Sequence, residues 1–142
     1  MNRITSIALF AILLSLTHLS CSRSNNDVIN DISPIISTGE WTVTNFSERG
    51  INETADFSGF SFVFQAGGKL MVNKSGSVFK EGSWSEDKSS GKLIINLGIK
   101  DNTNKPLGEL TDDWVITAKS ETRINLTDDN SASNEFLEFS KK

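Results

Sequence analysis

From Gly39 onward, apolar residues recur at every second position, and no stretch repeats them at helical spacing over three turns. Phe60, Phe62 and Phe64 show the alternation most clearly, and Trp41 with Val43 repeats it. Alternation of this kind is typical of strands that bury one face. The sequence therefore predicts an all-β fold.

Eight segments carry this pattern, and runs of Gly, Ser, Asn and Asp separate most of them. The predicted strands cover residues 41–44, 60–64, 70–72, 78–84, 93–99, 114–118, 124–126 and 137–139. Strands joined by tight turns favour an antiparallel up-and-down sheet, and eight of them can close into a barrel without open edges. The prediction is an eight-stranded β-barrel, with a two-sheet β-sandwich as the alternative that fits the same pattern.

Two connections are longer than a turn, at residues 47–58 and 100–112. Within the second, Pro106 to Leu110 is the best candidate for a helical turn. Long loops in compact domains are often lids or binding loops, although some are only surface excursions. Both interpretations stay open for these two connections.

The first twenty residues have the order of a secretion signal. Arg3 supplies a positive charge, residues 4–16 are mostly apolar, and Ser20-Cys21 precedes a polar stretch. The apolar part is shorter than the roughly 20 residues that a membrane-spanning helix needs. An ordinary signal cleaved after Ser22 is the alternative, and it would remove the only cysteine of the chain.

This arrangement resembles the signal peptides of bacterial lipoproteins. The resemblance implies that Cys21 becomes the first mature residue and carries acyl chains, palmitate among them, which attach the protein to a membrane. Asp does not follow Cys21, and by resemblance to known sorting rules this favours the outer membrane, on either of its faces. The expected organisation is a signal peptide at 1–20, a lipidated cysteine with a flexible tether at 21–37, and a barrel domain at 38–142. Pro34 argues against a helix in the tether, while Ile32, Ile35 and Ile36 are expected to dock on the domain's edge.

Removal of residues 1–20 leaves 122 residues with 13 basic and 18 acidic side chains, a net charge of −5. No basic stripe is present, so nucleic acid is not an expected partner. The only histidine, His18, lies in the predicted signal, and the chain contains no tyrosine. With Cys21 acylated, the usual bases and nucleophiles near neutral pH are absent, and so are the imidazole and thiolate ligands of zinc and copper. The protein is therefore not expected to be an enzyme, and no catalytic residue is predicted.

Acidic residues occur in adjacent pairs at Glu86-Asp87, Asp112-Asp113 and Asp128-Asp129. Calcium prefers oxygen ligands, and the stretch at 128–130 is the best candidate to bind it. However, the chain has no Asp-x-Asp-x-Asp-Gly loop, and acidic pairs at strand ends are ordinarily solvated. No metal ion or other cofactor is predicted.

Gly39-Glu40-Trp41 opens the first predicted strand, and Gly82-Ser83-Trp84 repeats the Gly-x-Trp pattern later. Over about residues 38–140 the chain resembles the lipocalin-like lipoproteins common in Bacteroidetes. The resemblance implies that Trp41 plugs one end of the barrel, that Arg123 packs on a closed-end tryptophan, and that the connection at 47–58 takes the place of a lid.

Six aromatic residues are candidates to line a cavity or to fill the core: Trp41, Phe60, Phe62, Phe64, Trp84 and Trp114. An eight-stranded barrel can hold one small ligand or can be filled by its own side chains. Two functions are therefore expected. One is a lipid-anchored cell-envelope binding protein that holds a small hydrophobic ligand. The alternative is an envelope interaction, structural or inhibitor protein with a filled barrel and no ligand.

Overall fold

The computed structural model of the protein describes residues 31–142. The predicted signal peptide, with His18, and the predicted lipid-attachment residue Cys21 lie outside these residues. Within the described part of the chain, no helix is long and apolar enough to cross a membrane.

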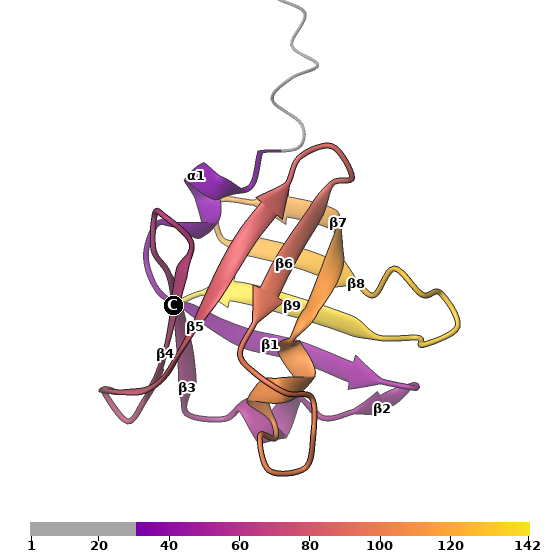
Figure 1. Ribbon diagram of the computed structural model, residues 1–142, viewed down its shortest axis with the longest axis horizontal. Helices are drawn as coiled ribbons and strands as arrows, with labels where there is room; N and C mark the ends of the chain where they lie inside the picture. The colour runs from indigo at the N-terminus through magenta and orange to yellow at the C-terminus, as the bar shows by residue number, and fades with distance from the viewer. Residues whose placement is uncertain (1–30) are drawn as a thin grey trace, which may run out of the picture.

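The strands form one antiparallel sheet, of which eight strands close into a barrel (Figure 1). They are β1 (Trp41–Glu48), β2 (Ile51–Asn52), β3 (Phe60–Phe64), β4 (Lys69–Lys74), β5 (Ser77–Asp87), β6 (Lys92–Asn96), β7 (Asp112–Ser120), β8 (Arg123–Thr127) and β9 (Phe136–Lys141). From β3 to β9, each strand pairs with the next one along the chain, and β1 lies between β9 and β3. The eight predicted strands correspond to β1 and β3–β9, so the prediction of an up-and-down barrel is confirmed and the sandwich alternative is not.

The two seams of β1 that close the barrel differ in length. β1 pairs with β9 along nearly its whole length, but it meets β3 at one register pair, Trp41 with Phe62. Beyond that pair β1 continues to a hairpin with β2, which the alternation had not predicted. The short helix η2 (Thr54–Phe57) lies beside β1, where the Phe57 ring packs against Phe46 at 5.1 Å.

Aromatic rings fill the barrel interior. Phe139 contacts Phe62 at 5.3 Å and Phe64 at 5.5 Å, and Phe64 continues to Trp84 at 5.8 Å, all edge to face. Edge-to-face pairs bring the positive rim of one ring against the negative face of the next. The chain of rings joins β9, β3 and β5 across the interior.

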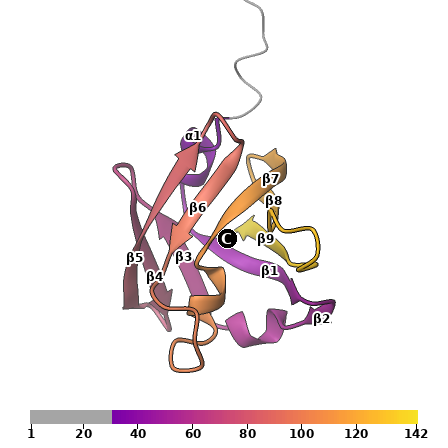
Figure 2. The same cartoon turned by 45° about the vertical axis from the view of Figure 1, so that its right-hand side comes forward.

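Two short helices close opposite ends of the barrel (Figures 1 and 2). At one end, called the α1 end, Trp41 Nε1 donates to the carbonyl of Ile36 in α1 (Ser33–Ile36) at 2.9 Å. At the other, called the loop end, Trp114 Nε1 donates to the carbonyl of Leu110 in η3 (Leu107–Leu110) at 3.0 Å. A buried indole N–H needs a partner, and here each closing helix supplies it. The helical turn predicted near Leu110 is confirmed.

The prediction that no helix forms around Pro34 is wrong, because α1 forms there. Proline is tolerated in the first turn of a helix, where its missing N–H has no partner within the helix. The docking predicted for the isoleucines is confirmed, since Ile32 and Ile36 are fully buried and Ile35 packs against the core. The packed part of the chain therefore begins before residue 38.

The strand predicted over 93–99 ends earlier, at Asn96, and Ile99 is 74% exposed. Gly98 has φ +99°, a conformation that side chains with a Cβ rarely adopt and that turns the chain out of the sheet. The alternation of apolar residues continues to Ile99, although the backbone stops pairing with its neighbouring strands after Asn96.

Candidate functional site

The two long connections of the sequence meet at the loop end. They line a hollow of about 470 Å³ between the β1–β2 hairpin and the chain around η3. Its walls carry charges of both signs, from Glu48, Arg49, Glu53, Lys100, Asp101, Lys105 and Glu109. Charged groups facing one another across a hollow favour a polar partner over an apolar one.

The connection around η3 is held by side chains that satisfy its backbone groups. Asn104 Nδ2 donates to the carbonyls of Leu97 at 3.1 Å and Ile99 at 2.8 Å, and Asn104 Oδ1 accepts from Lys80 of β5. Thr111 Oγ1 accepts from the Leu97 amide at 2.9 Å. Buried or half-buried loop backbone needs such partners. This loop is therefore a fixed part of the surface.

Lys100 lies among three carboxylates beside the hollow. Its Nζ is 3.4 Å from Glu135 and 3.9 Å from Asp112, and oxygens of Asp112, Asp128 and Glu135 all lie within 4.8 Å of one another. Burial raises the pKa of Glu135 and of Asp112, because it disfavours their charged forms. Burial opposes the charge on Lys100, but its ion pairs outweigh that effect and raise its pKa. Because the lysine itself supplies positive charge here, we assign no metal ion to these residues.

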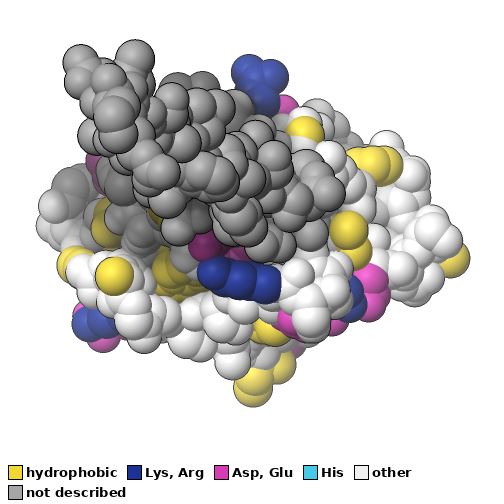
Figure 3. All heavy atoms as spheres, turned by 90° about the horizontal axis from the view of Figure 1, so that it is seen from above, with side chains coloured by type: hydrophobic (Ala, Val, Ile, Leu, Met, Phe, Trp, Pro, Cys, Tyr) yellow, Lys and Arg dark blue, Asp and Glu magenta, His cyan; other side chains and the backbone are white. Residues whose placement is uncertain are grey.

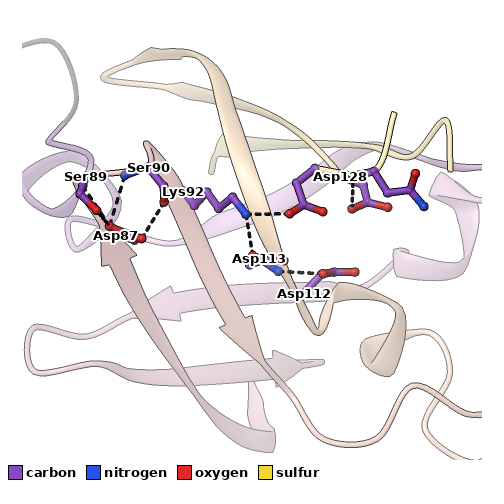
Figure 4. A network of polar contacts seen from close by, with 9 residues as sticks. Asp87, Ser89, Ser90, Lys92, Asp112, Asp113 and Asp128 are labelled. Carbon is purple, nitrogen blue, oxygen red and sulfur yellow. Dashed lines mark hydrogen bonds and ion pairs between the residues drawn. The ribbon is translucent and has the colours of Figure 1, made fainter. Parts of the chain in front are cut away.

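The second residues of two of the acidic pairs, Asp113 and Asp129, bind a different lysine (Figure 4). Lys92 of β6 lies 2.7 Å from Asp113 of β7 and 2.7 Å from Asp129. Hydrogen bonds from Lys92 hold the pKa of Asp113 below its usual range, and the same bonds raise the pKa of Lys92. The run at 128–130 thus divides between two ion-pair groups and does not form one oxygen cage.

Exposed apolar residues surround the loop end. Ile51 is 63% exposed and lines the hollow, Ile99 is 74% exposed next to Lys100, and Phe79 is 58% exposed next to Lys80. The Phe79 ring packs edge to face on Phe60 at 5.3 Å.

The first half of β5 has an open edge. β5 pairs with β4 from Ser77 to Ser83, but with β6 only from Ser83 to Asp87. On the β6 side, Ser77 to Gly82 therefore have no strand partner among the described residues, and Val78 on this edge is 52% exposed. A strand edge with free backbone groups and apolar side chains is a typical place for contact with another protein.

The six aromatic residues singled out by alternation all lie in the core. Trp41, Phe62, Phe64 and Trp114 are fully buried, Phe60 is 5% exposed and Trp84 is 7% exposed. Trp84 also borders an outer hollow of about 460 Å³ beside α1, and its Nε1 donates to the Gln65 carbonyl at 2.9 Å.

The packing of Arg123 on a tryptophan, implied by the lipocalin resemblance, is wrong. The Arg123 side chain is 61% exposed and lies 3.7 Å from Glu138. Lys141 takes the implied place, with its Nζ 5.0 Å from the Trp41 ring. The sequence could not distinguish these two basic residues, because both lie near the last strands.

Alternation did not reveal the polar residues of the loop end. Lys100, Asn104 and Glu135 lie in connections or at strand ends, where no period applies. The run Asp101-Asn102-Thr103-Asn104 does indicate a turn, and the Thr103 and Asn104 amides donate to Asp101 Oδ1. Its contact with Lys80, 24 residues earlier, depends on the barrel and has no local signal.

No protein-family model and no curated protein matches the chain. Among solved structures, the chain is similar to a DUF4847 family protein from Bacteroides vulgatus ATCC 8482, with 17% identity and a TM-score of 0.58 over 79% of this chain and 98% of that one. It is also similar to an uncharacterized protein from Bacteroides eggerthii DSM 20697, with 15% identity and a TM-score of 0.54 over 75% of this chain and 99% of that one. At such identities the likeness is one of fold. The fold of this barrel thus has counterparts in Bacteroides, and the likeness to lipocalin-like lipoproteins stays a prediction.

Proposed function

We propose that this protein is a lipid-anchored protein of the cell envelope that binds a partner protein through the loop end of a filled barrel. The observation that carries the proposal is the packed interior. Rings of Phe62, Phe64 and Phe139 contact one another across it, and a helix closes each end. An interior occupied in this way supports the filled-barrel function over the storage of a hydrophobic ligand.

The loop end supplies the surface that such a protein needs. It combines a charged hollow, exposed Ile51, Phe79 and Ile99, and the open edge of β5. Apolar groups surrounded by polar ones are typical of protein-binding surfaces. A protein partner is therefore a better match than a small apolar molecule.

Attachment is proposed through acyl chains on Cys21, in the outer membrane. A catalytic role is not proposed, since residues 22–142 contain no His, Cys or Tyr. To test the anchor, the full chain and a Cys21→Ala variant are expressed in a Bacteroides host and the membranes are separated. The wild type is expected in the outer-membrane fraction and the variant in the soluble fraction. A variant that stays with the membrane contradicts the anchor.

The partner surface is tested by a photo-crosslinking amino acid placed at Ile99 or, as the matched control, at Ile94. Ile94 is 38% exposed in the middle of β6 and does not line the hollow. A distinct crosslinked species is expected from position 99 and not from position 94. Native mass spectrometry of the same protein checks the ligand alternative. A stoichiometric lipid beyond the anchor would favour ligand storage over the proposed function.

A further inference from the structure

One carboxylate fixes the chain that enters the barrel domain. Glu86 of β5 accepts hydrogen bonds from the amide of Ile32 at 2.7 Å, from the amide of Ser33 at 3.2 Å, and from the Ser33 hydroxyl. The first amides of a helix have no partner within it. The N-cap residue Ile32 makes no side-chain cap, and Asp31 Oδ1 accepts only from the Ser33 amide, at 3.1 Å, so Glu86 supplies the remaining cap bonds of α1.

Contacts on both sides extend this attachment over residues 31–37, called here the docked segment. Asp31 forms an ion pair with Lys88 at 2.7 Å, and the Ile36 carbonyl accepts from Trp41. The side chains of Ile32 and Ile36 are fully buried against the core. The chain is thus part of the folded body from residue 31 onward.

This docking limits how the domain can sit relative to an anchor at Cys21. Asp31 lies ten positions after Cys21, and such a chain reaches at most about 35 Å even when fully extended. A tether that was free to residue 37 would reach about 55 Å. The anchor would therefore hold the α1 end close to the membrane, while η3 lies at the opposite end of the barrel (Figures 1 and 2).

We propose that the docked segment is an orienting device, which turns the α1 end to the membrane and presents the loop end to partner proteins on the aqueous side. The inference rests on the proposed lipid anchor. It adds to the proposed function that the partner protein has a water-exposed domain that contacts the loop end, and that this contact lies outside the bilayer. Seen from the α1 end, the visible described surface carries scattered charges of both signs (Figure 3). The visible described part of this face offers no concentrated positive charge to lipid head groups, which supports attachment through the anchor.

Because Cys21 is the only cysteine, an introduced cysteine can be labelled selectively in the acylated protein. We place a donor dye at Glu121→Cys or at Asn102→Cys, in native outer membranes that contain an acceptor-labelled lipid. Glu121 lies at the α1 end, next to Thr122, whose carbonyl accepts from Lys141. Lys141 in turn donates to Thr38, just after the docked segment. Asn102 lines the hollow of the loop end, and both positions are exposed. Energy transfer is expected to be stronger from position 121 than from position 102.

The device itself is tested with Glu86→Ala, and Glu81→Ala is the matched control. Glu81 lies on the same strand and binds Lys69, far from the docked segment. Glu86→Ala is expected to abolish the difference between the two dye positions, and Glu81→Ala is expected to keep it. Hydrogen exchange at residues 32–37 confirms release of the segment, and Ser33→Ala is a milder variant if Glu86→Ala does not fold.

Each contrary result has its own meaning. Equal transfer from both positions in the wild type overturns the orientation, while the anchor still stands. A difference that persists in Glu86→Ala, although exchange shows that the segment is released, overturns the role of the docked segment. Absence of transfer from both positions overturns the anchor, and the orientation with it.

Discussion

The two acidic pairs of the loop end, Asp112-Asp113 and Asp128-Asp129, are divided residue by residue between two lysines. The first member of each pair lies beside Lys100, and the second member binds Lys92. Asp112 and Asp113 are neighbours in β7, where successive side chains point to opposite sides, whereas Asp128 and Asp129 follow the end of β8. Two adjacent aspartates look in the sequence like one concentrated negative charge. In the fold, each of them lies beside a different lysine, which partly neutralises its charge.

Glu135 has the more demanding environment of these carboxylates, since it is 6% exposed. Burial raises its pKa, so the folded protein binds a proton there more readily than the unfolded chain. Its contribution to stability is therefore largest at low pH and falls as the pH rises through the raised pKa. Glu135→Gln removes this titration. The free energy of unfolding of the variant, relative to the wild type, is expected to increase from about pH 4 to pH 7.

Urea unfolding followed by tryptophan fluorescence at several pH values measures this trend. Glu121→Gln, at an exposed carboxylate in the turn between β7 and β8, controls for the loss of one negative charge. A difference between Glu135→Gln and the wild type that is constant with pH contradicts the prediction.

Gly82 belongs to the second Gly-x-Trp, and its role is a close approach of two strands. A Cβ at this position would lie 2.2 Å from the Asn96 carbonyl oxygen, a backbone atom of β6. Gly82→Ala is expected to destabilise the fold by about 1–3 kcal/mol, the usual cost of overpacking. Thermal unfolding of Ser83→Ala, at the exposed neighbour, is the comparison. Equal stability of the two variants would mean that β6 can move away at little cost.

At the scale of elements, the short helix η3 contributes more to the core than its four residues suggest. η3 places Leu107 and Leu110 in the core and offers the carbonyl that Trp114 needs. Glu109 of η3 also lines the hollow, so η3 joins this surface to the core. Loss of its packing should therefore loosen the surface proposed for partner binding.

Leu110→Ala is expected to cost about 2–5 kcal/mol, because it leaves a cavity in the core. Amide exchange over residues 97–110 should become faster in the same variant. Ile99→Ala is the matched control, since Ile99 lies in the same connection and is 74% exposed; its effect should stay within about 0.5 kcal/mol. A loop that exchanges equally fast in both variants would show that η3 does not hold it.

The barrel strands could be predicted from the sequence far better than α1 and β2. Apolar residues at every second position indicate each barrel strand, because every strand buries one face. α1 carries no such signal, since most of its cap bonds come from Glu86, more than 50 residues away. β2 has only two residues, both exposed, so it has no buried face to leave a pattern. A distant cap in α1 and the lack of a buried face in β2 therefore explain why neither segment left a local pattern.

For the whole molecule, the same alternation cannot say whether a barrel is full. Phe60, Phe62 and Phe64 would alternate equally around a cavity or within a packed interior. The contacts of Phe62 and Phe64 with Phe139 and Trp84 argue for a packed interior, and they join residues that are more than 15 positions apart in the chain. The position of the six aromatic residues was thus predictable from the sequence, but the packing that argues for the proposed function was not.

A filled interior should become a binding site only when a ring is removed from it. Phe62→Ala is expected to cost about 3–5 kcal/mol and to leave an apolar cavity. Such cavities stay dry and take up small apolar molecules, so benzene should raise the melting temperature of Phe62→Ala and leave that of the wild type unchanged. Phe79→Ala removes the same side chain from a site that is 58% exposed and should show no benzene effect. A wild type that benzene or a long-chain fatty acid stabilises specifically would mean that the barrel already holds space for a ligand.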